Sequence, residues 1–118
     1  MFSVQGDIVL DPYPGTGTTT FAAIASARNS IGYEIDQNFK EILDARMNDI
    51  KDISNERNEQ RIEKHKEFMK KRLEAREEKY RNKNYDFPVV TNQETNLIIP
   101  RLKEVRKIVD TLFEVDYF

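Results

Sequence analysis

Residues 6–19 read G-D-I-V-L-D-P-Y-P-G-T-G-T-T, and this stretch decides the fold. The apolar run within Asp7–Asp11 predicts a short buried strand. Tyr13–Gly17 follows it with one Pro and two Gly, a composition typical of a turn. The sequence therefore predicts a strand that ends at Asp11 and opens into a glycine-containing turn.

A helix and a second strand are expected after the turn. The helix spans residues 20–27, with Thr18 or Thr19 as its cap. Its apolar stripe comprises Phe21, Ile24 and Ala25. Ser30–Asp36 then predicts a second strand. Two strands joined by a helix must pair in parallel with a right-handed crossover, so this part of the chain predicts an α/β fold with a short parallel sheet.

A long charged helix is predicted from residue 37 to about residue 83, where the sequence has neither Gly nor Pro. It is either one helix or two with a break near Ser54–Asn58. One face is marked by Phe39, Ile42, Leu43, Met47, Ile50 and Ile53. Lys64–Arg81 is basic enough to follow a phosphate backbone, but its Glu residues favour a solvated helix or a partner-binding face.

The last part of the chain predicts a connector and a C-terminal amphipathic helix. Residues 82–96 are rich in Asn, Asp, Pro and Thr, with a short extended piece expected at Phe87–Thr91. Leu97–Ile99 is either another strand or the lead into a helix that begins at Pro100. The final helix is predicted from apolar residues spaced three and four positions apart, namely Leu102, Val105, Ile108, Val109, Leu112 and Phe113. We therefore divide the chain into residues 1–53, 54–83 and 84–118.

Composition excludes several kinds of site. The 118 residues hold 19 Lys and Arg against 21 Asp and Glu, so no overall basic field points to nucleic acid. The absence of Cys excludes thiolate metal sites and fits a cytoplasmic location. His65, the one histidine, stands among Lys and Glu, and we predict no metal site. No apolar run is long enough to cross a bilayer, so we expect no membrane partner.

The turn after the first strand is where a ligand is expected. Ligands of open α/β sheets bind at the carboxyl ends of the strands, and the free amides of the following helix attract negative groups. Gly15 and Gly17 allow the backbone to come close to a ligand. The turn lacks the Lys that a nucleoside triphosphate requires. Asp11 would repel the pyrophosphate of a dinucleotide, whereas it suits the cationic S-adenosylmethionine.

A second carboxylate supports the same cofactor. Glu34 lies near the end of the second predicted strand, where a carboxylate can accept hydrogen bonds from both ribose hydroxyls. Ile35 follows it and could cover one face of the adenine. We expect Asp36 to cap the long helix. For Tyr13 the sequence leaves two options open, packing under the loop or touching the ligand.

These residues resemble the cofactor motif of the DNA methyltransferases that modify adenine N6 or cytosine N4. The family motif reads G-D-x-V-L-D-P-F-x-G-S-G-T-T, then a short helix and I-G-x-E/D, and residues 3–39 match it except for Tyr13 and Thr16. The resemblance implies a partial Rossmann-like methyltransferase fold that binds S-adenosyl-L-methionine. The cofactor-binding residues that it implies are Asp11, Pro12, Tyr13, Gly15, Thr16, Gly17, Thr18, Thr19, Glu34 and Ile35.

The catalytic turn of these enzymes is missing from the sequence. They hold the flipped base with D/N/S-P-P-Y/F/W, and no two of the four prolines here are adjacent. We therefore predict no catalytic residue in this chain, and we expect it to be the C-terminal portion of an enzyme whose catalytic half is an N-terminal segment or a second subunit. The complete enzyme would act on DNA, as in restriction–modification.

Two alternatives stay open from the sequence. RNA guanine methyltransferases also begin their motif with Asp-Pro, although Thr18-Thr19 and the Ile31–Asp36 ending favour the DNA group. The second alternative is a non-enzymatic assembly module with a vestigial Rossmann-like unit. In that case the long helix would pair with another copy or with a partner.

Overall fold

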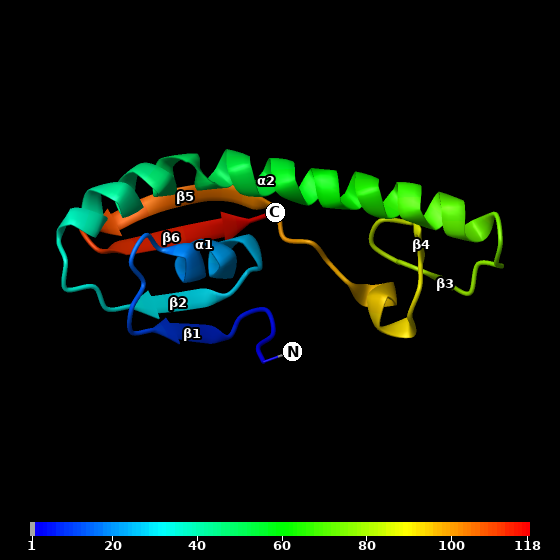
Figure 1. Ribbon diagram of the computed structural model, residues 1–118, viewed down its shortest axis with the longest axis horizontal. Helices are drawn as coiled ribbons and strands as arrows, with labels where there is room; N and C mark the ends of the chain where they lie inside the picture. Colours follow the sequence, from blue (N-terminus) through cyan, green and yellow to red (C-terminus); the bar gives the residue numbers. More distant parts are fainter. Residues whose placement is uncertain (1) are drawn as a thin grey trace. The chain divides into compact units, whose positions relative to one another are not determined.

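The computed structural model describes residues 2–118 as two units. The first unit runs up to Glu56 and also includes Pro100–Phe118, and the second comprises Arg57–Ile99. The first unit carries the glycine turn. Figure 1 labels the helices and strands of both.

The first unit begins with the predicted strand, turn, helix and strand. Strand β1 spans Ile8–Asp11, helix α1 spans Thr18–Ala25, and strand β2 spans Asn29–Gly32. The two strands pair in parallel, with Ile8 opposite Asn29 and Asp11 opposite Gly32. The predicted parallel pairing is confirmed, but β2 ends at Gly32 and Glu34 lies two residues beyond it.

The predicted cap of α1 is wrong. Gly17 is the N-cap residue, with a left-handed backbone (φ 82°, ψ 21°), and no side chain caps the helix. The left-handed conformation is one that glycine adopts without strain, so the chain turns sharply into the helix. Thr18 thereby becomes the first residue of α1 rather than its cap.

Helix α2 is one continuous helix of 36 residues, Asn38–Leu73. Of the two alternatives left by the sequence, the single helix is observed, and Ser54 and Asn58 are buried within it. Asp36 contributes to its start, since its carboxylate accepts a hydrogen bond from the Asn38 amide at 2.9 Å. The helix ends ten residues earlier than predicted, because Tyr80 and Arg81 pair with another strand instead.

The predicted C-terminal helix is wrong, because the segment is a β-hairpin. Strand β5 (Leu102–Val109) and strand β6 (Leu112–Tyr117) pair antiparallel around a turn at residues 110–111. The register shifts between Leu102 and Glu104 and again between Lys107 and Val109. Such irregularities interrupt the two-residue alternation of a strand, so apolar residues recur at spacings that imitate a helix. Strand β6 keeps the alternation, with Phe113, Val115 and Tyr117 on one face.

The core of the first unit lies between α1, the first half of α2 and the hairpin. Its buried members are Phe21, Ile24, Met47, Ile50 and Leu102. The Tyr117 hydroxyl donates a hydrogen bond to the Ile24 carbonyl at 2.7 Å, which joins β6 to α1. Figure 1 shows α1 between the β1–β2 pair and the hairpin. The parallel pair is therefore covered on the α1 side.

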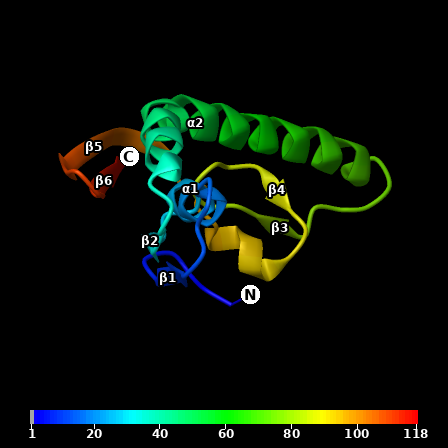
Figure 2. The same cartoon turned by 60° about the vertical axis from the view of Figure 1, so that its left-hand side comes forward.

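The second unit combines the rest of α2 with a short antiparallel pair. Strand β3 (Tyr80–Arg81) pairs with β4 (Pro88–Val89), and a 3₁₀ helix, η1, spans Asn92–Asn96. Asn82 is 1% exposed and its amide group donates to the carbonyls of Glu94 and Leu97. Figure 2 shows β3, β4 and η1 from the side. One buried asparagine thus holds the loop segments of this unit together.

Asn55 ties α2 to the start of β5. Its side-chain nitrogen donates to the Leu102 carbonyl at 2.9 Å, and its side-chain oxygen accepts from the Leu102 amide at 2.8 Å. Leu102 is 0% exposed, so water cannot readily replace these partners. This pair of hydrogen bonds fixes where the hairpin begins on the helix.

We expect Asn55→Ala to lower the free energy of unfolding by about 2 kcal/mol, because it leaves two backbone groups without partners. Urea denaturation followed by circular dichroism measures the change. Asn48→Ala on the exposed side of the same helix is the matched control, with an expected change within about 0.5 kcal/mol. Equal stabilities for the two variants would contradict this role.

Candidate functional site

The candidate site is the turn between β1 and α1, and the parallel register sets its position. Since Asp11 lies opposite Gly32, both strands end at the same level. The turn closes through a hydrogen bond from the Gly17 amide to the Pro14 carbonyl at 2.7 Å. A side chain on Gly32 would lie 3.1 Å from the Pro14 ring, so glycine there lets the turn fold against β2.

Glu34 reaches back to the turn from beyond β2. Its Oε2 accepts a hydrogen bond from the Gly15 amide at 3.0 Å, and its Oε1 accepts one from the Asp36 amide at 2.9 Å. Glu34 and Gly15 are 19 positions apart in the sequence. A carboxylate has about four acceptor positions, so these two bonds leave capacity for further donors. Glu34 is exposed, and those positions are open to a ligand.

Asp11 is held at the same turn by its neighbours. A hydrogen bond from the Thr19 hydroxyl lowers the pKa of the Asp11 carboxyl, and a second from the Tyr13 amide, at 2.9 Å to Oδ1, lowers that pKa further. Both donors favour the charged form. Asp11 is therefore an anion at neutral pH, and Asp11 and Glu34 both contact the turn between residues 13 and 15.

The two glycines of the turn differ in their surroundings. Both have positive φ, 49° at Gly15 and 82° at Gly17. A side chain on Gly17 would collide with Leu43 and lie 2.9 Å from the Phe21 ring, whereas nothing lies within 4 Å of the same position at Gly15. Gly17 thus allows close packing against α2, and Gly15 leaves open space beside Glu34.

Arg46 is a member of the site that the sequence did not suggest. Its guanidinium stands 4.1 Å from the centre of the Phe21 ring and donates a hydrogen bond to the Thr16 carbonyl. The contact therefore fixes the turn from α2, 30 residues away in the chain. Nothing in the spacing of α2 separates Arg46 from its other surface cations, so only the folded structure could identify it.

The remaining predicted site residues lie on or near the turn with more exposed side chains. Tyr13 is 87% exposed and Ile35 is 96% exposed. Tyr13 therefore does not pack under the loop, one of the two options left by the sequence. Pro12, Thr16 and Thr18 are also exposed. The turn thus presents apolar side chains beside two carboxylates.

The sequence of the chain is similar to proteins of one known family. Residues 1–45 match the model of a DNA methylase family. The chain is 43% identical over 117 residues to type II methyltransferase M.MthZI of Methanothermobacter thermautotrophicus. The match covers 99% of the chain and 32% of that protein. The resemblance to the DNA methylases is confirmed.

Two further type II methyltransferases match shorter stretches. Type II methyltransferase M.MjaI of Methanocaldococcus jannaschii is 60% identical over 47 residues, which are 40% of the chain and 16% of that protein. Type II methyltransferase M.HinfI of Haemophilus influenzae is 43% identical over 54 residues, 46% of the chain and 15% of that protein. The chain thus spans at most about a third of these relatives. No solved structure matches it.

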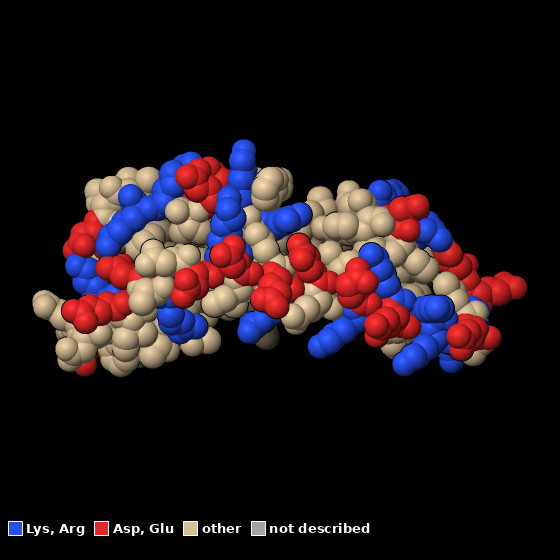
Figure 3. Space-filling view, turned by 90° about the horizontal axis from the view of Figure 1, so that it is seen from above, with Lys and Arg blue, Asp and Glu red and all other residues tan. Residues whose placement is uncertain are grey.

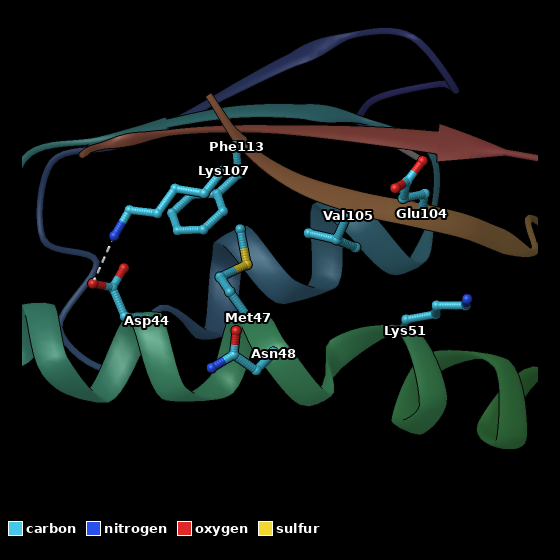
Figure 4. Close-up of a pocket in the computed structure, with 8 residues that line it drawn as sticks. All are labelled: Asp44, Met47, Asn48, Lys51, Glu104, Val105, Lys107 and Phe113. Atoms are coloured by element: carbon cyan, nitrogen blue, oxygen red, sulfur yellow. Dashed lines mark hydrogen bonds and ion pairs between the residues drawn. The ribbon is translucent and has the colours of Figure 1, made fainter. Parts of the chain in front are cut away.

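A separate pocket lies between α2 and the β5–β6 hairpin (Figure 4). It has a volume of about 420 Å³, and none of the DNA methylase motif residues lines it. The Lys107 ammonium and the Asp44 carboxylate at one end pair with each other at 3.0 Å. Met47, Val105 and Phe113 form its apolar wall. This pocket therefore reflects how the hairpin packs on the helix and adds nothing to the methylase motif.

Among residues 2–118, no three His, Cys, Asp or Glu side chains gather to hold a metal ion. His65 Nε2 lies 2.9 Å from the Pro88 carbonyl, and its ring contacts Phe87, so it packs inside the second unit. None of the described helices is both long and apolar enough to span a membrane.

We expect Thr19→Val to raise the pKa of Asp11, because the variant removes the donor that contributes most to its lowering. Because the pKa of Asp11 is lower in the folded chain than in the unfolded chain, ionised Asp11 stabilises the fold at neutral pH. This contribution is lost as the pH falls through the folded-state pKa. NMR titration of the Asp11 carboxyl carbon measures the change. Thr18→Val, at the exposed neighbour, is the control, and an unchanged Asp11 pKa in Thr19→Val would contradict the assignment.

Proposed function

We propose that the chain is the S-adenosylmethionine-binding portion of a DNA amino-methyltransferase with a Rossmann-like fold. The observation that carries the proposal is that Asp11 and Glu34 both bind the backbone of one glycine turn. The turn lies at the carboxyl ends of parallel strands, where α/β proteins bind nucleotides. The family match over residues 1–45 supports the same conclusion.

Charge selects the cofactor. Hydrogen bonds keep Asp11 ionised, and an anion at this position repels phosphate while it attracts an ammonium or sulfonium group. Residues 11–19 contain no Lys or Arg, and Arg46, which reaches the turn from α2, bonds the Thr16 carbonyl. S-adenosylmethionine, when bound, supplies a methyl group activated by its positive sulfur. The residues present therefore suit this cofactor better than a phosphorylated one.

Each residue of the turn has a proposed task. Asp11 holds the cationic methionine end, and Gly15 gives that end room because its side-chain position is open. Glu34, with two of its acceptor positions used, accepts the ribose hydroxyls with the others. Ile35 and Tyr13 offer exposed apolar surface to the adenine. Arg46 and Thr19 are positioning residues that act through Thr16 and Asp11.

The remaining parts of the reaction require groups that these 118 residues do not hold. Amino-methylation needs a side chain that holds the flipped base, and the resemblance assigns that task to a proline-pair turn absent here. Ile8, Leu10 and Ile31 on the parallel pair are 67%, 62% and 47% exposed. We propose that a catalytic segment or second subunit covers this apolar surface and presents the base of a DNA substrate.

Titration calorimetry with S-adenosylmethionine tests the cofactor site. We expect Glu34→Gln and Asp11→Asn each to weaken binding about 10-fold to 100-fold, because each removes a charge-assisted contact of about 1.5–3 kcal/mol. Asp7→Asn is the matched control, since Asp7 lies at the opposite end of β1 and bonds the Val4 amide. Equal affinity in all three variants, or no binding by the parent chain, would overturn the proposal.

We also expect the chain alone to transfer no methyl group to DNA. The reason is chemical, because no residue of the motif that orients the amino nitrogen is present. Incorporation of tritiated methyl groups into a mixed-sequence duplex measures the activity. A complete methyltransferase such as M.HinfI serves as the positive control. Turnover by the purified 118-residue chain above the no-enzyme background would contradict the prediction.

A further inference from the structure

Four basic residues on the second half of α2 lie along one face of the helix, with one apolar residue among them. Arg57, Arg61, Lys64 and Lys71 are exposed, and their spacings of four, three and seven residues place them on one face of the helix. Phe68 lies on the same face and is 52% exposed. At 1.5 Å per residue the stripe is about 21 Å long. We call these five residues the basic stripe.

Acidic side chains of the same helix lie elsewhere on its surface. On average, Glu59, Glu63 and Glu67 fall about a third of a turn away from the basic stripe. Figure 3 looks down on α2 and shows acidic side chains in a row along it, with basic side chains beside the row. The two signs are thus separated around the helix rather than alternating along one face.

Two cations of the basic stripe have no acidic neighbour at helical spacing, whereas Lys64 and Lys71 each have Glu67 three or four positions away. No residue three or four positions from Arg57 or Arg61 is acidic. In this half of the helix, Glu63 pairs with Lys66, outside the stripe, at 3.0 Å. The like charges of Arg57, Arg61 and Lys64, at spacings of four and three residues, repel one another along the helix. A bound polyanion would offset this repulsion.

Charge is also divided between the two units. Residues 57–99 hold 11 Lys and Arg against 8 Asp and Glu, a formal charge of +3. The rest of the chain holds 8 against 13, a formal charge of −5. The overall charge of −2 conceals this difference, and it is the unit with the basic stripe that attracts anions.

We propose that the basic stripe binds the phosphate backbone of double-stranded DNA. One strand carries a phosphate about every 3.4 Å of duplex length, so a stripe of about 21 Å runs beside about six phosphates. The choice of DNA among polyanions rests on the proposed function. The stripe contacts phosphates and not base edges, so it adds affinity without reading the recognition sequence.

Fluorescence anisotropy with a labelled 30-base-pair duplex of mixed sequence tests the proposal on the full 118-residue chain. Four phosphate contacts give a salt slope of about −3.6, equivalent to a roughly 150-fold loss of affinity between 50 and 200 mM salt. We expect the quadruple variant Arg57→Gln, Arg61→Gln, Lys64→Gln, Lys71→Gln to lose this slope. The variant Arg57→Lys, Arg61→Lys keeps the charge and should keep the slope.

The matched control removes four positive charges elsewhere in the same unit. It carries Lys66→Gln, Lys70→Gln, Arg76→Gln and Lys79→Gln, all at exposed positions outside the basic stripe. We expect it to retain most of the parent slope, since the stripe is intact. Circular dichroism verifies that all variants fold. Equal losses in the two quadruple variants, no binding by the parent chain at 50 mM salt, or tighter binding to single-stranded RNA than to the duplex would overturn the proposal.

Titration of the same variants with S-adenosylmethionine separates this inference from the proposed function. Stripe variants that bind the cofactor normally but lose the duplex support both. A parent chain that binds the duplex through the stripe but not the cofactor keeps the inference and overturns the proposed function. A parent chain that binds the cofactor but not the duplex keeps the proposed function and overturns the inference about the stripe.

Discussion

The parallel pairing of β1 and β2 aligns Asp11 with Gly32, and the site is built on that alignment. Because both strands end at one level, the chain beyond β2 runs beside the turn beyond β1. Glu34 can then bond the Gly15 amide across 19 residues of sequence. Gly32 and Gly17 make the arrangement sterically possible, the first under Pro14 and the second against Leu43 and Phe21.

Electrostatics gives the same arrangement its chemical character. The turn accumulates negative charge, with the Thr19 hydroxyl lowering the pKa of Asp11 and no cationic side chain within the turn itself. Arg46 approaches from α2, where one of its N–H groups bonds the Thr16 carbonyl and its guanidinium packs on the Phe21 ring. The turn itself therefore carries Asp11 and no cation of its own, while the excess of positive charge lies in residues 57–99.

The hairpin shows how a structural irregularity can imitate another periodicity. Leu102, Val105, Ile108 and Val109 have helical spacing, yet two register shifts in β5 account for it. Val115 and Tyr117 in β6 alternate as a strand should, and β5 is rich in β-branched residues. The position of the hairpin is set by Asn55, which occupies both hydrogen-bonding groups of Leu102. Sequence periodicity contains no trace of that contact.

The sequence by itself determined the strand, turn, helix and strand of residues 8–32, their parallel pairing, and the two carboxylates of the candidate site. These features depend on local signals, namely an apolar run, glycines at positive φ, and a helical crossover that permits only one pairing. Tertiary structure alone decided that Thr19 serves Asp11 instead of capping α1, that Arg46 holds the turn, and that residues 102–117 form a hairpin. The roles of Arg46 and of the hairpin depend on contacts between segments that are distant in sequence. The role of Thr19 depends on which of two local hydrogen bonds forms. Such contacts produce no periodic pattern in the sequence.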